Sequence, residues 1–181
     1  MAAKSVPTPV ARRLSQVELD MICAKHDRLW SCKPGGARAV LAWKDLSRLD
    51  LRGRNLRDAD CTGAIFASCQ MQGVTLDHAN LFGADMQNAD LSESSLRRAD
   101  LRGVCLRGAN LTGADLFEAD LREGAIATMD RHSGFKLHEH VNRSGQIEGA
   151  NLSGANLERS RLSGVMAMKA DFTDAVMKVL G

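Results

Sequence analysis

Apolar residues recur at every fifth position through most of the chain. From Leu41 to Ile126 every fifth residue is apolar, and the residue two positions earlier is small in most cases. A step of five residues turns a side chain by about 140° around an α-helix, so no helix face would be uniformly apolar. On a straight strand an odd step sends successive side chains to opposite faces. The chain must therefore bend once in every five residues.

One bend in each pentad would let four pentads close a square coil. The apolar residue and the small residue two before it would then both point inward, and stacked coils would bury them in ladders about 4.8 Å apart. The Asp or Asn that precedes many leucines would face outward and bond turn amides, and the glycines that follow suit the corners. The expected core ladder includes Leu81, Leu91, Leu101, Leu111 and Leu121.

The stretch "ADLRGVCLRGANLTGADLFEADL" resembles the pentapeptide repeat proteins, whose motif is A(D/N)LXX. The resemblance covers residues 39–128 and 145–179. It implies an all-β solenoid, a right-handed quadrilateral β-helix. It also implies a scaffold for protein contacts, because the family has no shared active site.

The two ends of the chain differ. Ser15 and Glu18 form a predicted capping box, so a helix should begin there and close the first coil. Its contact face is expected at Val17, Met21, Ala24 and Leu29. The expected organisation is a flexible tail at 1–13, an N-terminal α-helical cap and turn at 14–38, repeats at 39–128, an inserted loop at 129–144, and repeats again at 145–181.

The last pentads have no comparable cap. They add four apolar residues to the inward set, Met166, Met168, Val176 and Val179. An open coil end exposes ladders and strand edges, which a second copy, a partner or further sequence should cover. A homodimer through this end is one expectation, and a truncated final coil is the other.

The repeat is interrupted between residues 127 and 144. Continuing the first register would put Arg131 and Lys136 inside, where neither could lie unpaired. Ile126 and Ile147 are 21 residues apart, four pentads plus one. The segment should therefore leave the wall as a loop or small hairpin, with Ile147 on the face next to Ile126. A degenerate coil would instead return Ile147 to the same face.

Three interpretations of the interruption stay open, since long loops in compact folds are often functional. It could contact a partner, and the candidate residues are His132, Phe135, Lys136, His138 and His140. It could hold a metal, with the candidate ligands Asp130, His132, His138 and His140. It could also be a polar loop whose histidines have no role.

Charges on the walls should alternate between coils. A spacing of twenty puts Arg57, Asp77 and Arg97 on one ladder, where they can pair. Arg102 above Arg122 looks unpaired, which leaves an anion-binding patch as the alternative. Phe82, Phe117 and Trp43 fall at outward positions, as contact residues or as partly covered side chains.

Composition narrows the possible functions. Lys and Arg total 24 and Asp and Glu total 22, so neither direct nucleic-acid binding nor an acidic DNA-like surface is favoured. Five cysteines without paired spacing, and no apolar signal segment, favour the cytoplasm, and no run is long enough to span a membrane. Cys61 and Cys69 should point inward and Cys105 outward. The regular aspartates are explained by the corners, so no catalytic residue, cofactor or metal site is assigned.

The sequence thus favours a non-enzymatic interaction scaffold whose walls and 127–144 loop contact a protein partner. Its family resemblance offers an alternative, a DNA-mimicking modulator or protector of DNA gyrase of the quinolone-resistance type. The net charge of +2 disfavours this alternative, because a mimic should repel DNA. A metal-dependent enzyme that uses the histidines is the third class.

Overall fold

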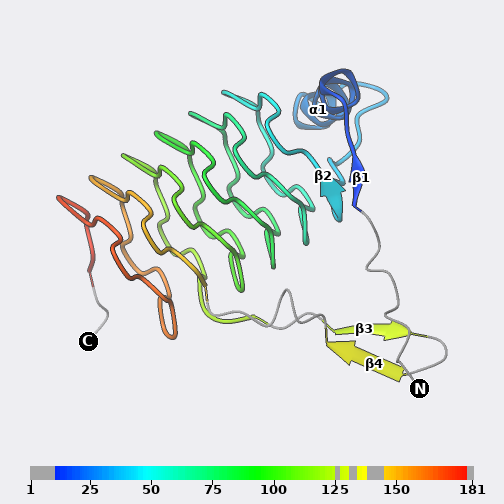
Figure 1. Cartoon of the computed structure of the whole chain (residues 1–181). Coiled ribbons are helices and arrows are strands. Elements are labelled where there is room, and N and C mark those ends of the chain that lie inside the picture. Colours follow the sequence, from blue (N-terminus) through cyan, green and yellow to red (C-terminus); the bar gives the residue numbers. More distant parts are fainter. Residues whose placement is uncertain (1–10, 125–126, 131–133, 138–144, 179–181) are drawn as a thin grey trace.

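Parallel bridges between residues twenty apart build the body of the molecule, as Val40 pairs with Asp60 and Asp45 with Ile65. The computed structural model describes residues 11–124, 127–130, 134–137 and 145–178. Figure 1 shows the coils stacked along one axis with the helix at one end. Since each coil of four pentads makes four such bridges, it has four walls. The predicted solenoid of square coils is confirmed.

Each corner is a tight turn closed by hydrogen bonds within the pentad. The Ala84 amide donates to the Leu81 carbonyl at 2.9 Å. Gly83 between them has a φ of 64°, a left-handed conformation that glycine adopts without strain. The Phe82 amide donates to the side chain of Asn80 at 3.1 Å. Small residues, glycines and Asp or Asn recur because they suit these turns, although other corners place a residue such as Asp58, His78 or Arg98 in the left-handed conformation.

The interior is a continuous apolar column. The inward residues of neighbouring pentads are fully buried together with the small residues before them, at close-packed density. This confirms the predicted core ladder, Leu81, Leu91, Leu101, Leu111 and Leu121.

The N-terminal segment closes the first coil. Strand β1 (Arg12–Arg13) pairs in parallel with β2 (Lys44–Asp45), and helix α1 (Gln16–Trp30) follows. The predicted capping box is present, because Ser15 accepts from the Glu18 amide and the Glu18 side chain accepts from the Ser15 amide. Residues 1–10 of the predicted tail lie outside the described residues.

Helix α1 packs through a face that the sequence analysis did not choose. Its buried residues are Leu19, Cys23 and His26. Val17 is 67% exposed and Met21 55% exposed. The predicted contact face, Val17, Met21, Ala24 and Leu29, therefore points to solvent. Pairing of β1 with β2 and the bond from the Ala39 amide to His26 Nδ1, 3.0 Å long, fix the rotation of the helix.

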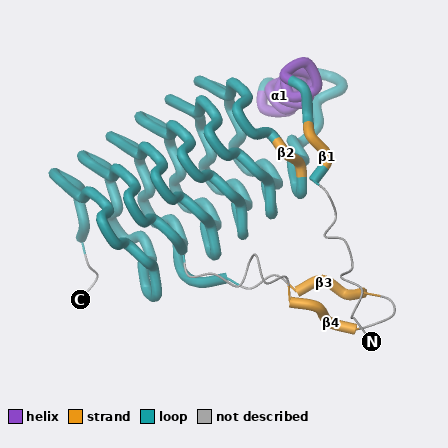
Figure 2. The backbone as a smooth tube through the Cα atoms, viewed as in Figure 1, coloured by secondary structure: helices purple, strands orange, loops and turns teal. Residues whose placement is uncertain are grey.

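The interruption of the repeats contains a hairpin. Strand β3 (Ala127–Asp130) pairs antiparallel with β4 (Gly134–Leu137), with Asp130 opposite Gly134. Figures 1 and 2 show these two strands outside the stack of coils. The sequence predicts either a loop or a small hairpin here, and the described part of the segment is a hairpin.

Coil stacking resumes after the hairpin with its register unchanged. Cys105 bridges Gln146, a separation of 41 residues, which is one coil of twenty plus 21 inserted residues, 125–145. Ile147 therefore follows Leu106 on its ladder, the place that the sequence analysis gave to Ile126. The expectation that Ile147 would occupy the next face is wrong, because the chain leaves the wall before Ile126. Ile126 itself lies outside the described residues.

Candidate interaction site

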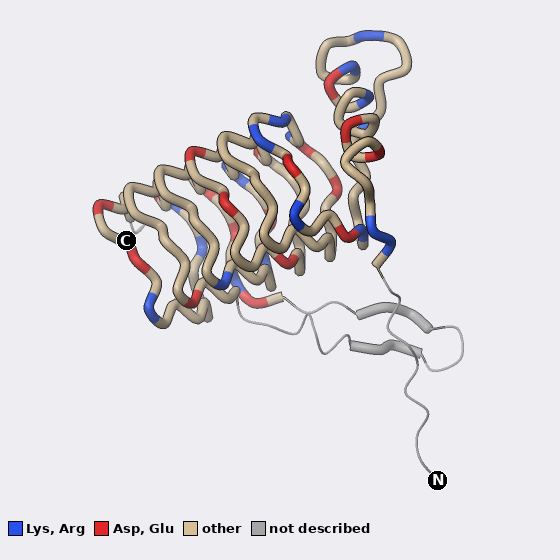
Figure 3. Tube along the Cα trace, turned by 45° about the horizontal axis from the view of Figure 1, so that its top comes forward, with Lys and Arg blue, Asp and Glu red and all other residues tan. Residues whose placement is uncertain are grey.

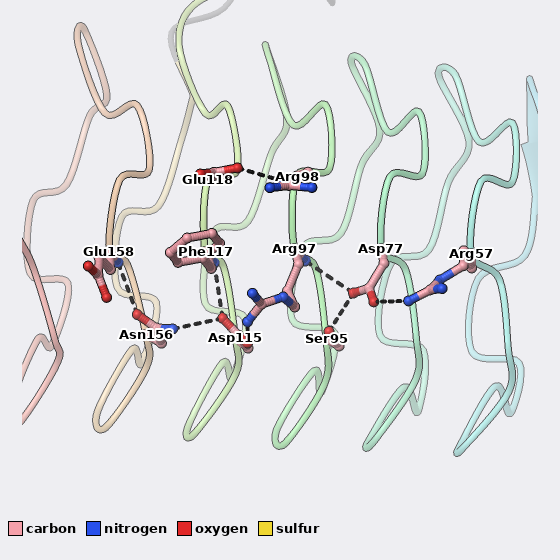
Figure 4. A network of polar contacts seen from close by, with 10 residues as sticks. All are labelled: Arg57, Asp77, Ser95, Arg97, Arg98, Asp115, Phe117, Glu118, Asn156 and Glu158. Carbon is pink, nitrogen blue, oxygen red and sulfur yellow. Dashed lines mark hydrogen bonds and ion pairs between the residues drawn. The ribbon is translucent and has the colours of Figure 1, made fainter.

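One wall carries a polar network that crosses several coils (Figure 4). Asp77 is 6% exposed and accepts hydrogen bonds from Arg57 Nη2 at 2.9 Å and from the Arg97 amide at 3.2 Å. The Ser95 hydroxyl also donates to it. Burial by itself would raise the pKa of Asp77, but the hydrogen bonds from Ser95, Arg57 and Arg97 outweigh burial and lower it. Asp77 is thus a buried, ionised centre of the wall.

Arg57 joins this network to the cap. Its guanidinium lies 5.6 Å from the centroid of the Trp30 ring. The Trp30 ring in turn meets the His26 ring edge to face, with centroids 6.3 Å apart. The last turn of α1 is therefore anchored to the wall through a cation–π contact and a buried histidine.

The network continues toward the C-terminal coils. Arg97 Nη1 pairs with Asp115 at 2.5 Å, and Asn156 Nδ2 donates to Asp115 at 2.9 Å. Arg97 also lies over the Phe117 ring at 4.6 Å, and Arg159 over the same ring at 5.6 Å. Phe117 is thus half-buried and in contact with two arginines, of which Figure 4 shows Arg97.

Charges of opposite sign pair between neighbouring coils, and the twenty-residue spacing predicts some of these pairs. The Arg97 side chain, expected to pair with Asp77, instead pairs with Asp115, eighteen residues away. Arg57 pairs with Asp77, and Arg98 Nε lies 2.6 Å from Glu118 Oε2. Figure 3 shows basic and acidic segments interspersed along the coils.

The prediction that Arg102 and Arg122 are unpaired is wrong. Arg102 donates to both oxygens of Asp100, at 2.8 and 2.7 Å, and Arg122 does the same to Asp120, at 2.9 and 2.7 Å. Each arginine turns back to the aspartate of its own corner, two residues earlier, a pairing that spacing between coils cannot reveal. Arg102 also lies over the half-buried Phe82 ring at 5.2 Å.

The cysteines are mainly core residues. Cys61 and Cys69 are buried as predicted, and burial raises the pKa of the Cys69 thiol to about 11. Cys105, predicted to be exposed, is buried as well. Its Sγ faces Gln146 Oε1 at 3.6 Å, because the coil that follows the hairpin covers it.

Much of the predicted loop site lies beyond what the structure describes. His132, His138 and His140 lie outside the described residues, while Asp130, Phe135 and Lys136 lie on hairpin strands described by their backbone alone. Their roles as partner contacts or metal ligands stay predictions. Within the described ranges, no three His, Cys, Asp or Glu side chains are grouped to hold a metal.

Gly124 and Gly145, here called the base glycines, lie where the chain leaves the wall and where it re-enters it. Gly145 is expected at a bend from the sequence, whereas Gly124 was not singled out. A Cβ at Gly145 would lie 2.2 Å from the Leu121 carbonyl oxygen. At Gly124 it would lie 2.9 Å from a Phe82 ring carbon and 3.0 Å from the carbonyl carbon of Arg102. The "EG" and "SG" pairs that flank the interruption were the available signal. The chain leaves and re-enters the wall where only glycine fits.

A hollow of about 390 Å³ opens on the corner where Glu118 and Asp120 lie. Its lining is Arg98, Glu118, Asp120, Arg159 and Arg161. A second hollow of about 390 Å³ lies beside it and shares two of these arginines, Arg159 and Arg161.

The fold and its walls define a β-helical repeat protein with a capped first coil and one inserted hairpin. The chain belongs to the pentapeptide repeat family. The family model "Pentapeptide repeats (8 copies)" matches it over residues 45–83, 76–113, 84–122 and 146–178. No curated protein matches it. In the part of the chain that the structure describes, no helix has the length and apolar character to cross a membrane. The cytoplasmic location stays a prediction.

Solved structures of three pentapeptide repeat or resistance proteins are similar to this chain. One from the thylakoid lumen of Arabidopsis thaliana is 27% identical, with a TM-score of 0.41 and 70% of each chain covered. Another, from Nostoc PCC 7120, is 22% identical, with a TM-score of 0.43 and coverage of 93% of this chain and 98% of that one. QnrB1, a plasmid-mediated fluoroquinolone resistance protein, is 22% identical, with a TM-score of 0.38 and coverage of 73% and 60%.

Proposed function

We propose that the protein is a non-enzymatic scaffold for protein–protein interaction, with contacts made by the coil walls and by the 127–144 segment. The main support for this proposal is that the coils stack in the same register before and after the inserted segment. The 21 residues enter between two coils that stack as if nothing separated them, so that Gln146 bridges Cys105. The described core residues on either side of the insertion keep the stacking that they would have without it. Segments kept at no benefit to a core are often functional.

The walls support a role in binding because their polar side chains are already ordered. Asp77 and Asp115 each hold several donors, and Phe117 is fixed between two arginines. A partner that docks on such a wall would lose little side-chain entropy of the scaffold.

The alternation of charge supports this proposal over the gyrase alternative. A DNA-like surface needs rows of like-signed carboxylates, whereas Asp77, Asp115 and Glu118 are each neutralised by a close arginine. A supercoiling assay discriminates between the two. Inhibition or protection of gyrase at micromolar protein, with or without a fluoroquinolone, would favour the mimic, and no effect would favour the scaffold.

A frame-preserving excision tests the hairpin. Removal of residues 125–145 joins Gly124 to Gln146 and leaves "LREGQIEGANL", an uninterrupted run of pentads. The shortened protein should fold with undiminished stability, as measured by circular dichroism and urea unfolding. It should lose a partner that the intact chain captures in a pull-down.

A matched control replaces residues 129–143 with a Gly/Ser sequence of equal length and keeps both base glycines. It should lose the same partner as the excised protein. Equal capture by the intact chain, the excised protein and the Gly/Ser control would indicate that the walls, and not the hairpin, contact the partner. Failure of the intact chain to capture any stoichiometric partner would reject the scaffold.

We further propose that a second copy covers the last described coil. Its inward residues are incompletely buried, unlike those of every middle coil, and the exposed apolar residues around them are Met166, Met168, Val176 and Met177. Lys169 and Asp174 lie at adjacent corners of this coil. A two-fold axis that passes between the two corners would bring Lys169 of one copy to Asp174 of the other.

A further inference from the structure

Two neighbouring carboxylates, Glu118 and Asp120, each lie close to two arginines. Asp120 gives both of its oxygens to the fork of Arg122, at 2.9 and 2.7 Å. These bonds lower the pKa of Asp120. Arg161 Nη1 remains 3.7 Å from Asp120 Oδ2, which is too far for a hydrogen bond. Arg161 therefore shares the charge of Asp120, and it donates no side-chain hydrogen bond to any of the residues that the structure describes.

Glu118 is also shared by two arginines, but both of them donate hydrogen bonds to it. Its Oε2 lies 2.6 Å from Arg98 Nε, whereas its Oε1 lies 3.3 Å from Arg159 Nη1. Four arginines thus surround two carboxylates, a surplus of two positive charges. The side chains that carry the surplus, Arg159 and Arg161, are 48% and 66% exposed. They lie two residues apart on one coil.

Arg161 breaks the rule of its own ladder. The bridged residues below it are Asp60, Asn80, Asp100 and Asp120, and Val40 stands on the same ladder in the first coil. A side chain in this place normally accepts from a turn amide, as Asp120 does from the Arg122 amide at 3.2 Å. Arginine cannot accept that bond. In the described coils, Arg161 is the one position directly before a ladder residue with a positive charge. Such local departures from a fold's rule concentrate at functional sites.

The two surplus arginines border both hollows on this corner, each of about 390 Å³. Lys178 lines the second hollow with them and adds a further positive charge. The Phe117 ring beneath Arg159, at 5.6 Å, limits where that guanidinium can lie. A small anion could therefore meet two guanidinium forks from one side.

We propose that Arg159 and Arg161 form a binding site for a phosphate group, carried either by a free phosphate compound or by a phosphorylated side chain of a partner. A phosphate monoester has a charge of about −1.5 to −2 at pH 7 and three acceptor oxygens, which match two guanidinium forks. One carboxylate would leave a positive charge unmatched. The site stands independently of the scaffold proposal, and only the second source of phosphate rests on it.

Isothermal titration at pH 7.5 and constant ionic strength tests the site with three probes. These are inorganic phosphate, a phosphoserine peptide and the same peptide without phosphate. The intact chain should bind at least one phosphate probe at least tenfold more tightly than acetate or the unphosphorylated peptide. Binding of inorganic phosphate indicates a free compound as the source, and binding of the phosphopeptide alone indicates a partner.

Two substitutions identify the residues responsible. Arg161→Asp introduces the residue type found at Asp60, Asp100 and Asp120 of the same ladder, so it should keep or raise stability while it weakens phosphate binding at least tenfold. Arg159→Gln should weaken binding as well. The control, Arg52→Gln, removes an exposed arginine that is paired with Asp50 on another wall and should leave binding unchanged.

Equal phosphate affinity in the intact chain and in the folded Arg161→Asp protein would overturn the proposal. So would equal affinity for phosphate and acetate. The hairpin excision leaves all the site arginines in place, so a failed scaffold test and a failed phosphate test remain distinguishable.

Discussion

At the scale of single residues, Asp77 stands out because it accepts hydrogen bonds from both neighbouring coils. It links Arg57 from the coil before it to Ser95 and Arg97 from the coil after it. Removing one partner from a buried charged network costs more than the bonds themselves, because the remaining groups stay desolvated. The stability of this wall should therefore be most sensitive to substitution of Asp77, a residue that no repeat motif specifies.

We expect Asp77→Asn to lower the free energy of unfolding by about 1–3 kcal/mol at pH 7. Because the folded-state pKa of Asp77 lies below its ordinary value of 3.8, the ionised side chain contributes stability above that value. The contribution is lost as the pH falls through the folded pKa. Urea unfolding from pH 7 to pH 2.5 should show the two proteins converging at the acid end.

The control for this measurement is Asp27→Asn, a substitution at an exposed aspartate of α1. It should change stability by less than about 0.5 kcal/mol at neutral pH. A difference between wild type and Asp77→Asn that stays constant across the pH range would show that the charge of Asp77 does not matter.

At the scale of elements, the sequence located α1 but not its orientation. The Ser15 and Glu18 capping box is a local pattern, so it could be read without tertiary structure. The helix has two apolar stripes, and periodicity alone cannot tell which one packs. The choice depends on the pairing of β1 with β2, which fixes the helix rotation through contacts distant in sequence.

A matched pair of substitutions on α1 tests this assignment. Leu19→Ala should cost about 2–5 kcal/mol of stability, because Leu19 is fully buried against the first coil. Met21→Ala should change stability by less than about 0.5 kcal/mol, because Met21 is largely exposed. Urea unfolding of both proteins is the measurement. A larger loss for Met21→Ala would mean that the helix packs through the other stripe.

The repeats and their site residues show the same limit. A five-residue period is visible along the chain, so the ladders could be assigned residue by residue. Ile126 is apolar and continues the five-residue period by coincidence. The sequence therefore does not reveal that the chain leaves the wall before this residue. Arg122 pairs within its own corner, where side-chain direction decides and the twenty-residue spacing gives no information. The role of Arg161 as an exception to its ladder emerged only once the register after the hairpin was known.

At the scale of the whole molecule, the two ends of the solenoid are unequal. The first coil is closed by Leu14, Leu19 and Cys23, all buried, whereas the last described coil leaves Val165 and Phe172 only half-buried. An apolar end face favours association. The expected assembly is a dimer with two-fold symmetry and both α1 helices at its far ends.

Light scattering after size exclusion at tens of micromolar should give twice the mass of one chain. Met168→Lys introduces a charge on the proposed contact and should shift the protein to the monomer. Met21→Lys, an equal change on the exposed face of α1, should leave the dimer intact. A monomeric wild type, or a dimer insensitive to Met168→Lys but broken by Met21→Lys, would contradict pairing through the last coil.

The unbroken register on either side of the hairpin separates two kinds of selection within one chain. Substitutions in the coils are limited by side-chain volume, turn geometry and strand pairing, because each coil must fit its neighbours. Between Gly124 and Gly145 those demands end, since the coils already stack as though the segment were absent. Its sequence is free to drift, lengthen or be exchanged for another without disturbing the rest. Binding specificity could therefore evolve, or be grafted, at a position where foldability is not at stake.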